Sequence, residues 1–430
     1  MAEDAVVSGA TMEDFASDRT PALSVVQSIL DRNVGGIDDG HVMQCIRIEP
    51  LSGGLIGAVY RVTLKLAATS PASVQAVLPS QLILKLAPTS SLFQDLRSHA
   101  RECNFFQHHA DTLARVPRCY AALTSHQVYP CGLLLLEDLT LSGYRLADFD
   151  AGLNKIQLEA AVRCLARFHA STWNYGAVAA SGNQANAKDD TLPIRKASDW
   201  IFACEQFEST WPSLCEALSA SCSADTLQTS GFSSTVHALC RKLDTLPPCL
   251  CHGDLWANNV MFRDSSSSDS SNSAANPSAP SAKEDGKVAA STQTGVSAAF
   301  IDFQWVCIGN PLDDLAFLLL SSANYDVRRE CEKTLLHVYR AELISVLPAA
   351  QHDSVPQLDH LQQQYEVCKI GALIVMVASS DLFVLNQHTQ PRLVQAVQEV
   401  ATIITAVPKL AECARDCLRA ASVRSAQLYS

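Results

Sequence analysis

The sequence lacks several features that would assign it to common classes of protein. It contains no Gly-x-x-x-x-Gly-Lys-Ser/Thr motif, which excludes the P-loop nucleotide-binding folds. Its sixteen cysteines are scattered and include no Cys-x-x-Cys pair. This spacing predicts neither a zinc site nor a redox motif. We therefore expect reduced cysteines that serve as small apolar residues of the core.

Basic residues are also scarce. The chain has 32 Lys and Arg against 44 Asp and Glu, a formal net charge of −12, whereas a general nucleic-acid-binding protein needs a basic face. We expect no nucleic-acid partner, although one bound ATP needs only a local Lys, backbone amides and magnesium. No feature of the sequence identifies a protein partner.

Long apolar runs and a secretory leader are missing as well. The longest apolar stretch near the C-terminus, Ile370 to Ala378, is well short of a membrane span and is expected to form a buried helix. The segment from Met1 to Thr20 is acidic and has no basic start followed by an apolar core. These features predict a cytoplasmic protein without a membrane span.

Apolar residues make up 48% of the 430 residues, which is enough to bury two packed lobes. Alternating or continuous apolar runs predict strands in the first third of the chain, at Gln44–Ile48, Ala58–Leu66, Gln81–Ala87 and Gly132–Asp138. Apolar residues at steps of three and four predict helices at 92–114, Lys155–Thr172, Tyr325–Leu347, Leu358–Leu385 and Arg392–Ala421. The pattern indicates a sheet-rich front and a helical back.

Two short apolar runs interrupt the helical part and could pair as a hairpin, Asn259–Arg263 and Ala299–Phe303. The segment between them, 264–298, is rich in Ser, Ala, Asn and Pro and has almost no large apolar residue, so we expect disorder there. Because loop-closure entropy grows only logarithmically, this long tip costs roughly 1.7 kcal/mol more than a short one. The hairpin can therefore still bring residues 259 and 302 together.

The string Cys251-His-Gly-Asp-Leu-Trp-Ala-Asn-Asn259, with the later Asp302, carries the chemistry. Phosphoryl transfer from ATP needs a carboxylate on the acceptor hydroxyl, and an amide oxygen and a second carboxylate to hold magnesium. Asp254, Asn259 and Asp302 supply this set, and the first two stand five residues apart, as in the protein-kinase catalytic loop. Each piece alone could be a turn or a strand end, but the combination indicates a phosphotransferase.

Upstream residues supply the cation that such an enzyme needs on the phosphates. Lys85 lies in the middle of an apolar strand, and Glu102 on the following helix is its natural ion-pair partner. Gly53, Gly54 and Gly57 could let backbone amides approach phosphate, although their spacing is not a full Gly-x-Gly-x-x-Gly and a plain hairpin turn explains them equally well.

Three segments together resemble the ecdysteroid-kinase-like, choline-kinase-like family of the aminoglycoside phosphotransferase group. They are Leu250-Cys-His-Gly-Asp-Leu-Trp-Ala-Asn-Asn-Val-Met-Phe262, Phe300-Ile-Asp-Phe-Gln304 and Pro311-Leu-Asp-Asp-Leu-Ala316. The resemblance covers about residues 40 to 390. It implies an α+β, two-lobed protein-kinase-like fold with a small antiparallel-sheet N-lobe and a larger, mainly helical C-lobe. It also implies ATP, Mg²⁺ and a small-molecule hydroxyl acceptor.

The resemblance assigns a role to each matching residue. Asp254 would be the catalytic base, Asn259 and Asp302 the metal ligands, and Lys85 with Glu102 the phosphate-positioning pair. The resemblance also implies a hinge at Glu137, Asp138 and Leu139, whose backbone would contact adenine, and an Asp314 that steadies the catalytic loop. The helix that bears Leu165-Ala-Arg-Phe-His169 would pack beneath that loop. The long insertion and the loose glycine loop with Gly54 and Gly57 depart from the family pattern. His252 is expected to be structural, because Asp254 is the better-placed base.

The expected organisation is a disordered acidic tail over 1–22, an N-lobe over 23–137, and a C-lobe over 138–430 that contains the insertion 264–298. The acceptor could be sterol-like, choline-like or sugar-like, including a ketoamine sugar, because no motif between residues 172 and 250 identifies it. A catalytically inactive nucleotide-binding scaffold is the alternative function. The retained Lys85, Asp254, Asn259 and Asp302 favour an active enzyme.

Overall fold

The structure, a computed structural model, describes residues 26–27, 29, 43–51, 58–66, 79–87, 98–110, 113, 115–125, 132–174, 197–218, 246–264, 295–380 and 386–406. The tail expected over 1–22, the three glycines at 53, 54 and 57, and most of the expected insertion lie outside these residues.

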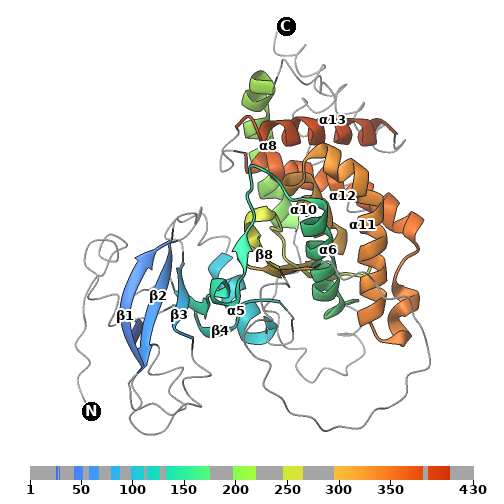
Figure 1. The fold of residues 1–430 in the computed structure, drawn as a ribbon. Coiled ribbons are helices and arrows are strands. Elements are labelled where there is room, and N and C mark those ends of the chain that lie inside the picture. The colour runs from blue at the N-terminus through green and yellow to red at the C-terminus, as the bar shows by residue number, and fades with distance from the viewer. Residues whose placement is uncertain are drawn as a thin grey trace.

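Five antiparallel strands form the sheet at the lower left of Figure 1. They are β1 (Met43–Pro50), β2 (Val59–Leu66), β3 (Gln81–Leu86), β4 (Cys119–Leu123) and β5 (Leu133–Glu137), in the order β1-β2-β3-β5-β4. The four strands predicted here are confirmed. Strand β4 was not predicted, because its short run Cys-Tyr-Ala-Ala-Leu gives no clear alternation.

The continuous apolar run of β5 has a structural cause. Leu133 and Leu135 belong to the core of the sheet, whereas Leu134 and Leu136 point the other way into the main core of the protein. Both faces of β5 are therefore buried, which favours leucine at four successive positions. Helix α5 (Ser98–His108) contributes Phe105 to the same main core.

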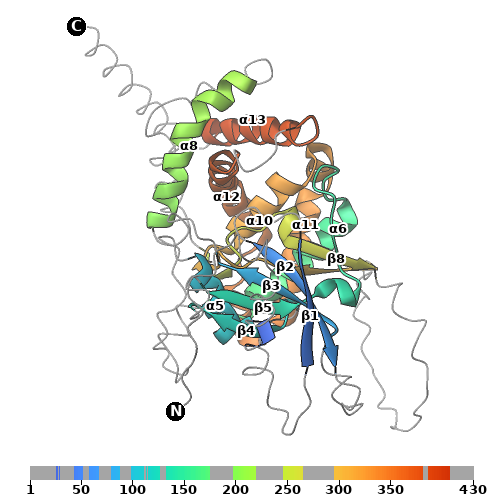
Figure 2. The same ribbon diagram turned by 90° about the vertical axis from the view of Figure 1, so that its left-hand side faces the viewer.

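The rest of the molecule is mainly helical. Its helices are α6 (Lys155–Ala170), α8 (Ala197–Leu218), α10 (Pro311–Ser322), α11 (Tyr325–Val346), α12 (Leu358–Ala378) and α13 (Gln390–Ala406). Every residue of α10 is buried, so this helix forms the centre of the lobe. Both views show α13 across the end of the lobe that is farthest from the sheet (Figures 1 and 2). Within the described residues, no helix combines the length and apolarity that a bilayer crossing requires.

Two small sheets support the helical lobe. Strand β7 (Cys249–Cys251) pairs with β10 (Cys307–Gly309), while β8 (Val260–Asp264) lies between β6 (Arg145–Leu146) and β9 (Val296–Phe300). The described part of the lobe also contains the short 3-10 helices η2 (Leu139–Ser142), η4 (Ala257–Asn259) and η6 (Ala349–Ser354).

The predicted hairpin is confirmed, but its bounds need correction. Val260 pairs with Phe300 and Asp264 pairs with Val296, so the strands reach into both ends of the segment 264–298 that was expected to be disordered. Composition missed this because Ala298, which is buried, is a small residue that carries little apolar signal.

The register suggests a sharp test of the insertion. Replacing residues 265–295 with Asn-Gly would join the paired residues Asp264 and Val296 by a two-residue hairpin turn. We expect the melting temperature to stay the same or rise slightly, because the closure entropy of the long connection disappears. Differential scanning calorimetry of the shortened and full chains measures this, and a loss of cooperative unfolding would show that the removed residues support the fold.

The arrangement of elements is that of the protein-kinase-like fold. An antiparallel sheet carries a lysine, Lys85, on its third strand, and the next helix, α5, carries a glutamate, Glu102. A mainly helical lobe with the Asp254 loop follows, as in protein kinases. The predicted α+β class and two-lobed architecture are confirmed.

Candidate active site

The candidate catalytic loop, which carries Asp254, begins where β7 ends, and it needs glycine at its first bend. Gly253 has a φ of +83°, and a Cβ atom there would lie 2.1 Å from the backbone oxygen of Trp305. Only glycine fits this position without moving the backbone. The bend leads directly to Asp254, whose side chain is half-buried.

Asn259 holds the far end of the loop. It is the last residue of η4 and is buried. Its Nδ2 donates hydrogen bonds to the backbone oxygen of Asp254 at 2.8 Å and to the Asp254 Oδ2 at 3.3 Å. The chain therefore folds back between Asp254 and Asn259, and the side-chain amide of Asn259 contacts the carboxylate of Asp254.

The β8–β9 hairpin adds Asp302 to this group. The Ile301 N–H donates to the backbone oxygen of Asn259 at 3.0 Å, so the chain enters the site beside the catalytic loop. Asp302 itself has a φ of +66°. Asp tolerates this left-handed conformation better than most residues, and backbone strain of this kind is typical of functional sites.

Lys85 connects the sheet to Asp302. Its Nζ lies 2.6 Å from Asp302 Oδ1 and 2.7 Å from Glu102 Oε2. Burial alone would lower the pKa of Lys85, but the charges of Asp302 and Glu102 outweigh it and raise this pKa. Glu102, which is 1% exposed, also accepts the Phe303 N–H at 3.0 Å. The structure thus brings together the three charged residues that the sequence selected.

Asp314 fastens the catalytic loop to the central helix. From the first turn of α10 its carboxylate accepts the His252 N–H at 2.6 Å and the Gly253 N–H at 2.9 Å. Its Oδ2 also lies 3.2 Å from His169 Nε2. Burial alone would raise the Asp314 pKa, but the hydrogen bonds with His169 and the Gly253 N–H and the electrostatic effect of His169 and His252 outweigh burial and lower it. The geometry agrees with the steadying role that the resemblance implies for Asp314.

The two histidines near this carboxylate are structural. His252 is buried and has a partner at each ring nitrogen. Its Nε2 lies 2.9 Å from the Ile301 backbone oxygen, and its Nδ1 accepts a hydrogen bond from the Asp254 N–H at 3.3 Å. His169, from the helix predicted to lie beneath the loop, contacts the Tyr339 hydroxyl through Nδ1 at 2.8 Å. Neither ring is left to take a proton from a substrate.

The hinge contains an ion pair that sequence reasoning missed. Asp138 follows β5 and is buried, and its Oδ2 accepts a hydrogen bond from Arg61 Nε at 2.7 Å. Leu139 packs with Tyr144 against β8 and β9. Arg61 lies on β2, 77 residues before its partner, so no local pattern could reveal the pair. The backbone contacts of Glu137 and Leu139 with adenine remain predictions.

The site has oxygen atoms suited to a hard divalent cation. Asn259 uses only its Nδ2 in hydrogen bonds to described residues, which leaves Oδ1 open, and Asp302 uses Oδ1 but not Oδ2. Amide and carboxylate oxygens are the ligands that Mg²⁺ prefers. The residues selected as metal ligands therefore fit such an ion.

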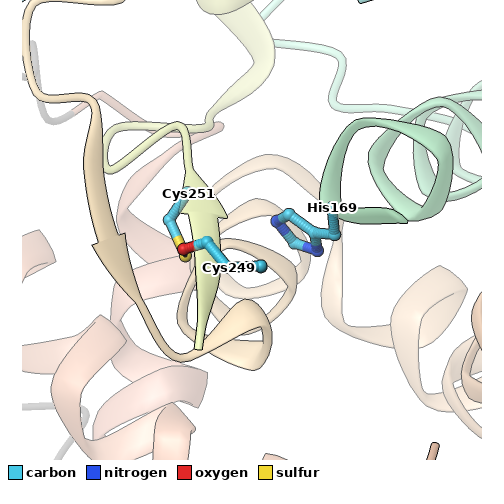
Figure 3. A group of neighbouring side chains, drawn as sticks. All are labelled: His169, Cys249 and Cys251. Carbon is cyan, nitrogen blue, oxygen red and sulfur yellow. The ribbon is translucent and has the colours of Figure 1, made fainter. Parts of the chain in front are cut away.

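A second group with metal-ligand chemistry lies behind the loop. Among the described residues, ligand atoms of His169, Cys249 and Cys251 lie within 4.8 Å of one another (Figure 3). Both ring nitrogens of His169 already have partners, and burial raises the pKa of both thiols. A metal would require two thiolates and a free nitrogen, so we interpret this group as part of the core.

Buried histidines make stability depend on pH. His99 on α5 lies 3.0 Å from the Leu123 backbone oxygen, and burial, with the nearby Lys85 charge, lowers its pKa below 6.5. The unfolded chain therefore binds more protons below pH 6.5, so stability falls as pH drops from there, by up to about 1.4 kcal/mol per pH unit for one such group.

We expect His99→Gln to make this decline shallower in urea unfolding measured from pH 8 to pH 5. His108→Gln, at an exposed histidine of the same helix, is the matched control and should leave the slope unchanged. Equal slopes for the wild type and His99→Gln would show that His99 is not the responsible group.

Comparison with known families gives two matches along the sequence. The sequence model of the Ecdysteroid kinase-like family matches residues 54–274, just over half of the chain. A second model, described as "Uncharacterized oxidoreductase dhs-27", matches residues 289–412. The chain has no Gly-x-Gly-x-x-Gly, the dinucleotide-binding fingerprint. No curated protein matches the sequence.

Solved structures with similar architecture include several small-molecule kinases. An ethanolamine kinase from Plasmodium vivax is 12% identical, with 92% of this chain and 91% of that chain covered and a TM-score of 0.44. The GDP complex of an aminoglycoside 2′-phosphotransferase IIIa variant is 12% identical, with 89% and 97% covered and a TM-score of 0.43. A choline/ethanolamine kinase family protein from Mesorhizobium loti is 11% identical, with 92% and 98% covered and a TM-score of 0.39.

Proposed function

The chain belongs to the ecdysteroid kinase-like family, and from this premise we propose that it transfers the γ-phosphoryl group of ATP to a hydroxyl group of a small molecule. The observation that carries the proposal is the meeting of the two lobes at charged residues. Lys85, held by Glu102 in the sheet lobe, contacts Asp302. Asn259 and Asp302 flank the paired strands β8 and β9, and the Asn259 amide contacts Asp254. These groups match the parts that phosphoryl transfer requires.

Each residue has a distinct role in this proposal. Asp254 accepts the proton of the acceptor hydroxyl, because it is the carboxylate of the loop that is not committed to Lys85. Lys85, which Glu102 holds at 2.7 Å, binds the phosphates of ATP. The open oxygens of Asn259 and Asp302 would hold Mg²⁺. When bound, this ion would neutralise charge on the β- and γ-phosphates.

Lys85 forms ion pairs with two carboxylates, Asp302 at 2.6 Å and Glu102 at 2.7 Å. Glu102 is the more deeply buried of the two and would keep Lys85 in position on the phosphates of ATP. Asp302 would serve the metal through its second oxygen.

A metabolite-extract screen tests the proposal. The full chain is incubated with ATP, Mg²⁺ and fractionated extracts, and mass spectrometry follows the appearance of phosphorylated products together with ADP release. We expect at least one new phosphate ester in the wild-type reaction and none with Asp254→Ala. If the wild type binds Mg-ATP yet phosphorylates nothing in any fraction, the protein is a nucleotide-binding scaffold and the proposal fails.

A further inference from the structure

Arg392 on α13 is a buried cation that joins three parts of the helical lobe. The residue is 4% exposed. Its Nη2 donates to the backbone oxygens of Phe149 and Asp150, both at 2.6 Å, and its Nε donates to Asn324 Oδ1 at 3.0 Å. The planar guanidinium suits this task, because its five N–H donors point in fixed directions. Arg392 therefore connects α13 to the loop before α6 and to the N-cap of α11.

The same guanidinium lies at the C-terminal end of α10. Its Nη1 donates to the backbone oxygen of Ser321, the second-last residue of that helix, at 3.5 Å. The last carbonyl oxygens of a helix lack partners within the helix and carry partial negative charge, so a cation is favourable there. The first turn of α10 holds the start of the catalytic loop through Asp314, and at the last turn the Ser322 hydroxyl accepts the Ala257 N–H at 2.8 Å. The loop is thus fastened to both ends of α10, and Arg392 caps the second end.

A further set of contacts leads from Arg392 to the catalytic loop through an aromatic ring. The guanidinium lies over the ring of Phe149, 5.0 Å from its centroid, and that ring packs edge-on against Trp256 with centroids 5.1 Å apart. Trp256 is 7% exposed, and its backbone oxygen accepts the Asn259 N–H at 2.9 Å. Asn259 in turn contacts the Asp254 carboxylate. Both sets of contacts therefore reach the turn between Asp254 and Asn259.

We propose that Arg392 is a positioning residue, which holds the turn between Asp254 and Asn259 from behind and touches neither ATP nor the acceptor. The inference rests on the proposed function, because it adds a residue to the same site. A carboxylate that accepts a proton must stay within hydrogen-bond reach of the acceptor hydroxyl, and a displacement of about 1 Å caused by a distant substitution can cost roughly 10²-fold in rate. Lys85 and Glu102, in the other lobe, keep their contact when Arg392 is lost.

Hydrogen exchange of the turn tests this role without requiring catalysis. The amides of Ala257 and Asn259 donate two hydrogen bonds of the turn, so their exchange reports how often it opens. Arg392→Met keeps an unbranched side chain but removes the guanidinium. We expect it to speed exchange over 255–260 at least about tenfold, measured by mass spectrometry on the full chain. Phe149→Leu removes only the ring beneath the guanidinium, should act in the same direction, and decides the question if Arg392→Met does not fold.

Glu399→Gln is the matched control for a general loosening of α13. Glu399 lies on the same helix, but its carboxylate forms ion pairs with Arg328 Nη2 of α11 at 2.6 Å and with Lys369 Nζ of α12 at 2.5 Å. The variant should therefore weaken the packing of α13 on its neighbours without acting on α10 or the loop before α6. We expect exchange over 255–260 to stay at the wild-type rate.

Kinetics with the acceptor found in the extract screen measures the consequence for the reaction. We expect Arg392→Met to lower kcat about 10- to 100-fold, while the Kd for Mg-ATP stays within about twofold of that of the wild type. Glu399→Gln should match the wild type in both constants. A fall in kcat at constant ATP affinity is the result of a misplaced loop, whereas a partly unfolded chain would lose ATP binding as well.

Wild-type exchange rates over 255–260 in both Arg392→Met and Phe149→Leu overturn the proposal, and so does an unchanged kcat of Arg392→Met. Equally fast exchange in Glu399→Gln also overturns it, because the effect would then come from a general loosening of α13. Failure of the proposed function appears differently, as absent phosphoryl transfer by the wild type to any extract fraction. The exchange measurement would still decide whether Arg392 holds the turn.

Discussion

Asp254→Ala is expected to lower turnover by about 10²- to 10⁴-fold while the affinity for ATP stays close to that of the wild type. The carboxylate acts on the acceptor hydroxyl and, in the proposed mechanism, touches neither the metal nor the phosphates. The structure indicates that the loop survives the change. Asn259 makes its shorter hydrogen bond, 2.8 Å, to the backbone oxygen of Asp254 and only the 3.3 Å bond to its side chain.

Two measurements check this expectation. The steady-state rate of ADP release with the acceptor found in the extract screen gives turnover, and isothermal titration with Mg-ATP gives the affinity. Asp359→Ala, at an exposed carboxylate in the first turn of α12, is the control and should match the wild type in both. Near-normal turnover of Asp254→Ala on that acceptor would remove Asp254 from the role of base.

Local patterns in the sequence were sufficient for most of the elements. The alternation in 81–87 placed Leu82 and Leu84 in the core and left Lys85 on the other face, which is the strand that the structure shows. The two runs that flank the insertion were predicted to pair, because both are apolar and each contains a residue selected for the chemistry. These residues are Asn259 in the first run and Asp302 in the second. Elements as short as β7 and β10, three residues each, carry no measurable period and were missed.

Contacts between distant segments could not be read in the same way. Lys85 lies 217 residues before Asp302, and Arg392 lies 243 residues after Phe149, whose backbone oxygen it binds. Periodicity reports which face of an element is buried, but not which other element covers that face. The ion pair of Lys85 with Glu102 could be predicted only because binding the phosphates of ATP requires a positive charge held in place. No such demand pointed to Arg392.

The helix that carries Asp314 shows how the two kinds of information combine. Asn310 followed by Pro311 is a residue pair typical of a helix start, and in the structure the Asn310 side chain accepts the Leu312 N–H at 2.9 Å. The sequence could not show that this helix begins directly under the catalytic loop. There the Asp314 carboxylate accepts hydrogen bonds from two backbone N–H groups of that loop. A rigid loop is what an acceptor-positioning carboxylate requires.

Asp302→Asn is expected to weaken magnesium-dependent ATP binding and nearly abolish turnover, because a neutral amide is a poorer ligand for a hard cation than a carboxylate. Asn is the right replacement here for a structural reason. Position 302 has a φ of +66°, and Asn adopts this left-handed conformation readily, so the backbone should be kept. The change removes the charge with little change of shape.

The variant also separates the metal from the lysine. Lys85 keeps its contact with Glu102 at 2.7 Å when the Asp302 charge is lost, so the phosphate-binding cation stays in place. ATP binding without Mg²⁺ should therefore be equal to or tighter than that of the wild type, since Lys85 no longer has to leave Asp302. Binding with Mg²⁺ should lose most of the gain that the metal gives the wild type.

Nucleotide titration with and without Mg²⁺ resolves these effects, with Asp326→Asn, at an exposed position of α11, as the control for loss of one negative charge. The ratio of the two dissociation constants, rather than either constant alone, reports the metal. A ratio in Asp302→Asn equal to that of the wild type would show that Asp302 does not bind Mg²⁺. The ion pair with Lys85 would then be a structural link between the lobes, and Asn259 would need another carboxylate as its partner at the metal.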